Sequence, residues 1–119
     1  MSNAFNPLVY KIAPRDSWDA SLPGGRYDGS PDDVRDGFIH LSSADQVRAT
    51  AAKYFAGQSD LVIAAVDAAK LGNTLKWEAA RDGGMFPHVY GPILSDMVLW
   101  TKALPLDDDG NFIFPREIS

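Results

Sequence analysis

The chain holds two histidines, and each lies in a short segment with other polar side chains. Ser42 follows His40 and Tyr90 follows His88, in both cases at a spacing of two residues, while Glu78 lies between the two segments. Imidazole groups exchange protons near neutral pH, and a carboxylate stabilises positive charge that develops in a transition state. These residue types therefore predict acid–base or charge-stabilising chemistry on a bound molecule.

Strand geometry gives a reason to expect these residues in one place. Side chains two residues apart on a strand point to the same face of the sheet. Segments 38–42, 75–78 and 88–90 have the composition of strands, so each presents a polar pair on one face. The sequence therefore predicts that one pocket is lined by His40, Ser42, Glu78, His88 and Tyr90.

Each residue also has a structural interpretation, which the sequence leaves open. Glu78 fits a solvent-facing strand position, where polar residues are ordinary. His40 has apolar neighbours and fits a core histidine held by one hydrogen bond. Ser42 fits the start of a following helix, and His88 with Tyr90 fits a rigid loop whose rings cap the core.

The elements that would position these side chains indicate a mixed α+β domain. Leu61 to Val66 is continuously apolar, which predicts a central strand covered on both faces. Ser43 and Gln46 have the spacing of a capping box, so we expect the main helix to start there and to bury a stripe that includes Tyr54. Further strands are expected at 8–12, 38–42, 75–79, 88–90, 97–104 and 112–114.

The segment between the first strand and His40 is predicted to carry little regular structure. Residues 16–21 could form a short helix that presents Trp18, and Pro23 to Asp36 reads as a loop because glycine, proline and aspartate dominate it. The expected fold class is α+β, with a curved or split sheet of about six strands and one main helix.

Composition limits the classes of partner. The chain has 119 residues, no cysteine and a net charge of −5, with 16 acidic and 11 basic residues. We expect a single domain over residues 1–119, with a core at about 8–104 and a turn and C-terminal extension at 105–119. The scattered basic residues argue against nucleic acid, and the longest apolar run is too short for a bilayer. We therefore expect a cytoplasmic protein with a small-molecule ligand, and the sequence does not predict its oligomeric state.

Three ordered segments resemble the hallmark motifs of a known family. Residues 36–43 (Asp-Gly-Phe-Ile-His-Leu-Ser-Ser), 75–78 (Leu-Lys-Trp-Glu) and 86–92 (Phe-Pro-His-Val-Tyr-Gly-Pro) are similar to those of domain of unknown function 952. The likeness extends from about Val9 to Leu104. That family is grouped by fold with the ADP-ribosyltransferase superfamily, which implies a split, strongly curved sheet that holds NAD or an ADP-ribose-like ligand in a cleft.

The resemblance also implies roles for individual residues. His40 would hold ribose hydroxyls, Ser42 would lie near nicotinamide or phosphate, and Glu78 would stabilise an oxocarbenium-like ribosyl transition state. The expected function is binding of a nucleotide-type ligand, with transfer or hydrolysis of an ADP-ribosyl group. NAD is then a candidate substrate, and no cofactor is assigned. The predicted catalytic residues are His40, Glu78 and His88, and the predicted ligand-binding residues are Ser42, Lys76, Phe86 and Tyr90.

Two other functions remain open at this level. A non-catalytic module could bind a small metabolite in the same pocket without turnover. A metal-dependent enzyme could use His40, Glu78 and His88 as ligands, a set that suits zinc or iron. The chain has no HxH or HxxxH spacing, so this second alternative ranks last and no metal ligand is assigned.

Overall fold

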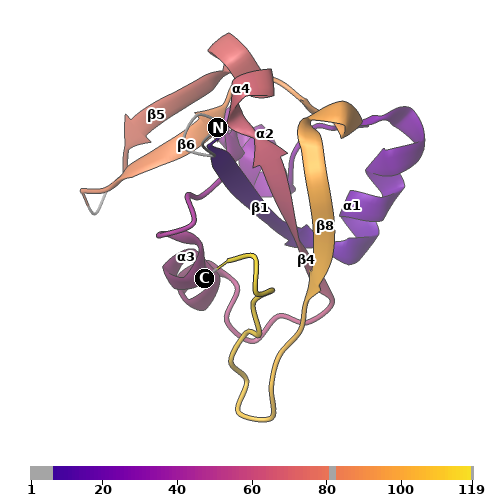
Figure 1. Cartoon of the computed structure of the whole chain (residues 1–119), viewed down its shortest axis with the longest axis vertical. Helices are drawn as coiled ribbons and strands as arrows, with labels where there is room; N and C mark the ends of the chain where they lie inside the picture. Colours follow the sequence, from indigo (N-terminus) through magenta and orange to yellow (C-terminus); the bar gives the residue numbers. More distant parts are fainter. Residues whose placement is uncertain (1–6, 81–82, 119) are drawn as a thin grey trace.

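The computed structural model describes residues 7–80 and 83–118 of the chain, and Figure 1 shows its elements in sequence colours. Within these residues it has eight strands and four α-helices. The strands are β1 (Leu8–Pro14), β2 (Arg26–Tyr27), β3 (Ile39–His40), β4 (Leu61–Asp67), β5 (Leu75–Ala79), β6 (Met85–Val89), β7 (Ile93–Leu94) and β8 (Val98–Leu104). The α-helices are α1 (Arg15–Ser21), α2 (Pro31–Asp36), α3 (Val47–Tyr54) and α4 (Ala68–Leu71).

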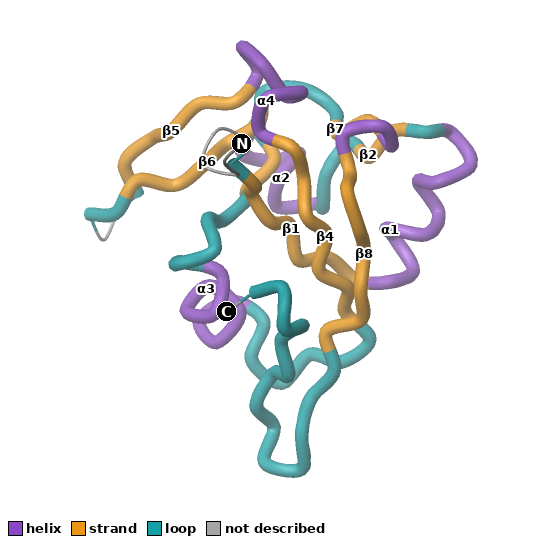
Figure 2. The backbone as a smooth tube through the Cα atoms, in the orientation of Figure 1, coloured by secondary structure: helices purple, strands orange, loops and turns teal. Residues whose placement is uncertain are grey.

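The strands form three antiparallel sheets with the orders β1-β4-β8, β2-β7 and β3-β6-β5. The two three-stranded sheets meet where Tyr10 and Ser42 exchange backbone hydrogen bonds of 2.7 and 2.9 Å. Figure 2 shows β5 and β6 extending away from β1, β4 and β8. The mixed α+β class is confirmed, with more strands and helices than the expected six strands and one main helix.

Strand β4 is the centre of the largest sheet, as its apolar run predicts. Residues 61–66 are all buried, with β1 paired along one edge and β8 along the other. Alternate side chains of β4 enter two separate hydrophobic clusters, because successive residues of a strand face opposite sides of the sheet. Val62, Ala64 and Val66 belong to the first cluster. Leu61, Ile63 and Ala65 belong to the second.

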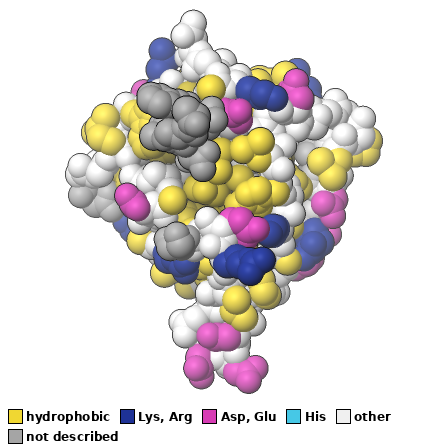
Figure 3. Space-filling view, viewed as in Figure 1, with side chains coloured by type: hydrophobic (Ala, Val, Ile, Leu, Met, Phe, Trp, Pro, Cys, Tyr) yellow, Lys and Arg dark blue, Asp and Glu magenta, His cyan; other side chains and the backbone are white. Residues whose placement is uncertain are grey.

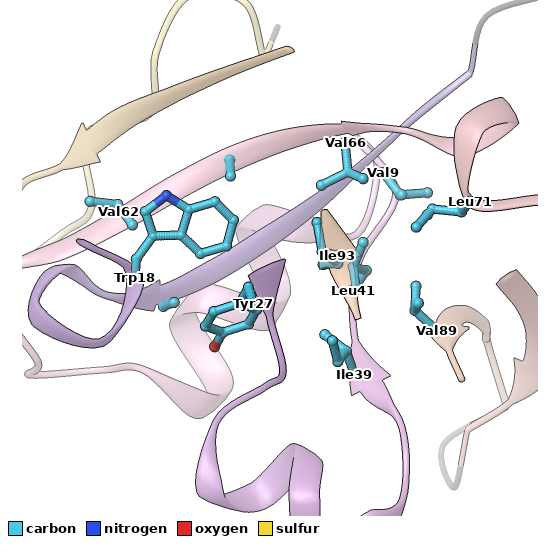
Figure 4. Close-up of a cluster of buried hydrophobic side chains, with 12 residues drawn as sticks. Val9, Trp18, Tyr27, Ile39, Leu41, Val62, Val66, Leu71, Val89 and Ile93 are labelled. Carbon is cyan, nitrogen blue, oxygen red and sulfur yellow. The ribbon is translucent and has the colours of Figure 1, made fainter. Parts of the chain in front are cut away.

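The first cluster anchors the segments that carry the two histidines. Figure 4 shows Ile39 and Leu41 of the His40 segment, and Val89 next to His88, among the buried side chains around Val9 and Ile93. Burial of a large aliphatic side chain contributes roughly 1.5–3 kcal/mol. Packing on the inner face therefore holds each histidine backbone in place, while the imidazoles lie on the opposite face.

The second cluster is closed by α3 and by the end of the chain. Val47 and Ala51 of α3 pack there, and Ile118 is almost fully buried beside them. The segment after Leu104 thus contributes to the core instead of only trailing from it. Phe112 is half-buried against the same cluster and pairs with Leu106 in an isolated bridge, where the sequence predicted an edge strand at 112–114.

Helix α2 forms where the sequence analysis expected a loop. The side chain of Ser30 accepts a hydrogen bond from the Asp33 amide, the Asp33 carboxylate accepts one from the Ser30 amide, and Pro31 occupies the first turn. Gly37 ends the helix with φ at 87°. This reciprocal cap and the terminal glycine stabilise a helix of six residues despite its turn-like composition.

Three local expectations also need correction. Helix α3 begins at Val47 and not directly after Ser43, although the Gln46 side chain still accepts a hydrogen bond from the Ser43 amide at 3.0 Å. Tyr54 was expected in the buried stripe but is 64% exposed. The strand expected at 38–42 is limited to Ile39 and His40. The short helix that presents Trp18 is confirmed as α1, and its tryptophan is buried.

Figure 3 shows one face of the molecule, with hydrophobic side chains near its centre and Lys, Arg, Asp and Glu around them. No histidine is visible in that view. None of the helices in the described part of the chain is both long enough and apolar enough to cross a membrane.

Candidate functional site

Strand pairing brings the two histidines together. His40 of β3 lies directly opposite His88 of β6, and their ring centroids are 5.5 Å apart in an edge-to-face arrangement. Strand β5 pairs with the other edge of β6 and sets Lys76 opposite His88 and Glu78 opposite Phe86. Directly paired residues share a face, so the predicted convergence of these side chains follows from the register.

Glu78, His88 and Tyr90 form a hydrogen-bonded group. His88 Nδ1 lies 2.7 Å from Glu78 Oε1, and the Tyr90 hydroxyl donates to the same oxygen at 2.8 Å. The hydrogen bonds from His88 and Tyr90 lower the pKa of Glu78. The hydrogen bond to Glu78 raises the pKa of Tyr90. Glu78 is therefore an ionised carboxylate at neutral pH, and its Oε2 atom takes no part in either bond.

Phe38 is the aromatic centre of the site. Its ring stacks on His88 with centroids 4.1 Å apart and an interplanar angle of 24°. It also contacts the rings of His40 at 4.7 Å and Tyr90 at 5.3 Å. Two of these four rings, His88 and Tyr90, hydrogen-bond to Glu78, so the cluster combines flat aromatic surface with a negative charge.

A buried ion pair lies beneath His40. Lys11 Nζ is 2.8 Å from Asp33 Oδ2, and the two side chains are only 5% and 2% exposed. The other oxygen of Asp33, Oδ1, lies 2.6 Å from His40 Nδ1 and accepts a hydrogen bond from the His40 amide at 3.1 Å. Lys11 also donates to the His40 carbonyl at 3.2 Å. The ion pair therefore holds both the backbone and the ring of His40.

The surroundings set the charge of this pair. Burial alone would raise the pKa of Asp33, but the hydrogen bond from His40 and the Lys11 ammonium outweigh it and hold the pKa well below its usual range. Burial lowers the pKa of Lys11, and Asp33 opposes that shift. An ionised carboxylate in the interior is retained only when it is paired and hydrogen-bonded, as Asp33 is.

The outward nitrogen of His40 also meets a carboxylate. Nε2 lies 3.1 Å from Asp36 Oδ2 at the end of α2. Both ring nitrogens of His40 therefore face acidic side chains, one buried and one half-exposed. Both contacts are hydrogen bonds only when the ring carries two protons, because each carboxylate can only accept.

The predicted ligand-binding residues do not all have the same neighbours. Lys76 and Phe86 share the face of the histidines through the β5–β6 register. Ser42 is buried, donates to Thr50 Oγ1 of α3 at 3.1 Å and pairs through its backbone with Tyr10. These contacts join the segment after β3 to β1 and α3, and none of them involves a histidine.

Four residues of this site were missed in the sequence analysis: Lys11, Asp33, Asp36 and Phe38. The spacing of Ser30 and Asp33 around Pro31 is a helix-start signal that would have identified α2. Lys11 stands inside an apolar strand, and a lysine at such a position needs a buried partner. Phe38 is two residues before His40, at the spacing that already linked His40 to Ser42.

Two cavities of about 240 and 370 Å³ lie outside this cluster. The first is lined by Trp18, Tyr27 and Trp100 among others, and the second by Arg15, Asp60 and Leu104 among others. In the part of the chain that the structure describes, no group of three or more His, Asp or Glu side chains is arranged to hold a metal ion.

Gly29 is predicted to be essential for the position of Asp33. Its φ is 113°, and a Cβ atom there would lie 2.7 Å from Asp33 Cβ. Gly37 is a matched control, because its φ is 87° and a Cβ would meet no atom within 4 Å. Gly37→Ala is expected to cost roughly 1–2 kcal/mol for backbone strain. Gly29→Ala should cost an additional 1–3 kcal/mol, roughly, for overpacking, as measured by urea unfolding. Equal losses in the two variants would contradict the close approach to Asp33.

Comparisons with known proteins match this chain to proteins of unknown function. A family model described as "Protein of unknown function (DUF952)" matches residues 12–101. The crystal structure of protein CC0527 from Caulobacter crescentus is similar, with 49% identity, a TM-score of 0.87, and coverage of 93% of this chain and 97% of that one. The solution NMR structure of the same protein has 52% identity and a TM-score of 0.79, covering 87% and 90%. No curated protein matches the chain.

Proposed function

The chain belongs to the DUF952 family of proteins of unknown function. We propose that its aromatic and acidic site binds a nucleotide-type ligand of the NAD or ADP-ribose class and transfers or hydrolyses the ADP-ribosyl group. The three motifs resemble those of this family, and the grouping of the family by fold with the ADP-ribosyltransferase superfamily motivates the choice of ligand. The lack of cysteine supports a cytoplasmic location within the same proposal.

The observation that carries the proposal is the ionised Glu78 carboxylate held by His88 and Tyr90, two members of a cluster of four rings. Cleavage of NAD breaks the bond between ribose C1′ and the nicotinamide nitrogen, and the bonding electron pair leaves with nicotinamide. Positive charge then develops on the ribose, and a fixed carboxylate stabilises it. His88 and Tyr90 keep Glu78 charged and oriented for that role.

His88 is suited to accept the proton released in the second half of the reaction. Its Nδ1 donates to the ionised Glu78, which leaves Nε2 with a lone pair in the neutral ring. Water or another hydroxyl adds to C1′ and transfers its proton to this nitrogen. The rings of Phe38 and Tyr90 offer stacking surface for a planar base.

A second candidate is a non-catalytic binding module with the same ligand class. The contacts of His40 favour it, because both ring nitrogens face carboxylates in the ligand-free protein. A metal-dependent reaction is not carried forward, because no group of three or more His, Asp or Glu side chains among the described residues is arranged to hold a metal ion.

Isothermal titration with NAD and with ADP-ribose at millimolar concentrations tests the proposal. Heat of binding is expected for at least one of the two compounds. Mass spectrometry of the same mixtures then separates the candidates, because catalysis releases nicotinamide from NAD and a binding module leaves NAD intact. Absence of heat with both compounds would contradict the proposed ligand class.

A further inference from the structure

We propose that Asp33, neutralised by Lys11, is a positioning residue that keeps a proton on Nδ1 of His40 and so makes Nε2 the ring nitrogen that meets the ligand. The proposal rests on the proposed function only for the presence of that ligand. The state of the ring is a property of the ligand-free protein.

The carboxylate of Asp33 is fully occupied by donors. Oδ2 accepts from Lys11 Nζ at 2.8 Å and from the Ser30 amide at 2.9 Å. Oδ1 accepts from the His40 amide at 3.1 Å and lies 2.6 Å from His40 Nδ1. A carboxylate has about four lone-pair sites, so these four contacts leave no freedom for it to turn.

The fixed carboxylate determines the tautomer of the ring. An ionised carboxylate only accepts, so the short contact to Nδ1 requires a proton on that nitrogen. The hydrogen bonds of the His40 amide and carbonyl fix the main chain at the same place. With the main chain held there, Nδ1 is the ring nitrogen that contacts Asp33.

Nε2 then lies on the side of the ring away from the buried pair, next to the half-exposed Asp36, and the His40 side chain is 40% exposed. The groups around the ring are Asp33 and Asp36 from α2, Lys11 from β1, the preceding Phe38 and His88 from β6. Asp36 is the half-exposed one of the two carboxylates and lies 3.1 Å from Nε2. In the neutral ring Nε2 holds a lone pair, so the contact with Asp36 is no longer a hydrogen bond and a ligand donor can replace it.

Long-range ¹H–¹⁵N NMR of the ring nitrogens tests the proposal directly, since the chain contains two histidines. At a pH where the ring is neutral, we expect a protonated Nδ1 and an unprotonated Nε2 in His40. The Nδ1 proton should also exchange slowly with water because Asp33 is buried. A neutral ring with its proton on Nε2, or a rapidly exchanging Nδ1 proton, would overturn the proposal.

A variant pair separates positioning from folding. The double variant Lys11→Met, Asp33→Leu removes both buried charges and should shift His40 toward the tautomer with the proton on Nε2. Asp36→Asn is the control and should leave the proton on Nδ1. An unchanged tautomer in the double variant would contradict the role of Asp33. If the double variant does not fold, the wild-type spectrum alone tests whether the proton of His40 lies on Nδ1. Because all of these spectra are recorded without ligand, a failure to bind NAD leaves their outcome unaffected.

Discussion

Asp33→Leu is expected to lower the free energy of unfolding by about 3–5 kcal/mol, because it leaves the ammonium of Lys11 buried without its charged partner. The two side chains are almost fully buried and lie 2.8 Å apart. The double variant Lys11→Met, Asp33→Leu should recover much of that loss, since replacing both members of a buried ion pair with apolar residues is often neutral. The single variant also removes the Asp33 half of the cap of α2.

Urea unfolding of wild type, both single variants and the double variant gives the coupling energy of the pair. Arg15→Met with Asp60→Leu provides a control cycle, because that ion pair is exposed and should couple by less than about 1 kcal/mol. Equal coupling in the two cycles would contradict a buried pair. The pKa of Asp33 is lowered by folding, so its contribution is complete above the unfolded value of about 3.9 and falls only at more acidic pH.

Glu78→Gln is expected to reduce kcat for nicotinamide release by about 10²–10³-fold, the usual loss when one charge-stabilising group is removed from a transition state. The amide keeps the size of the side chain but has no charge to offer the ribosyl cation. Its effect on folding should be small, because Glu78 is half-exposed on an edge strand. The urea midpoint should therefore remain close to that of wild type.

Glu117→Gln is the matched control for this substitution. The two glutamates are 40% and 38% exposed, and each accepts a hydrogen bond that lowers its pKa. Glu117 pairs with Lys102 of β8, which belongs to a different sheet from the strand that carries His88. We expect wild-type turnover in this variant. If both substitutions reduced turnover equally, the effect would reflect general surface charge and not a role for Glu78.

The parts of the fold that the sequence predicted are those where one pattern dominates. The continuous apolar run of β4 requires a covered central strand, and the alternation in β5 predicts the shared face of Lys76 and Glu78. Strand pleating predicted that His40 and His88 point to one face, and in the structure the two residues lie directly opposite each other on β3 and β6. The local periodicity of a strand was sufficient for these inferences.

The site was less predictable because much of it comes from long-range contacts. Asp33 is supplied by a short capped helix within a stretch of turn-forming residues, and its partner Lys11 comes from the first strand. No spacing along the chain connects these two residues. Ser42 shows the limit of periodicity, because β3 ends at His40 and the serine then pairs with Tyr10 instead of continuing the strand.

The Glu78 and Asp33 carboxylates give the two histidines different surroundings. His88 contacts one half-exposed carboxylate and a stacked Phe38 ring, whereas His40 lies between a buried and a half-exposed carboxylate. Such differences allow two identical side chains to take different roles in one site. In this account His88 exchanges protons, and His40 binds the ligand through Nε2.

Titration of the ¹⁵N-labelled protein with NAD, followed through the imidazole signals, tests most directly whether the two histidines form a ligand site. The account predicts that the signals of His40 and His88 both shift with one binding curve, most strongly at Nε2. The indole signals of Trp18 and Trp100, which line a separate cavity, should stay in place. Imidazole signals that remain unchanged at millimolar NAD, or shifts confined to the indoles, would contradict it.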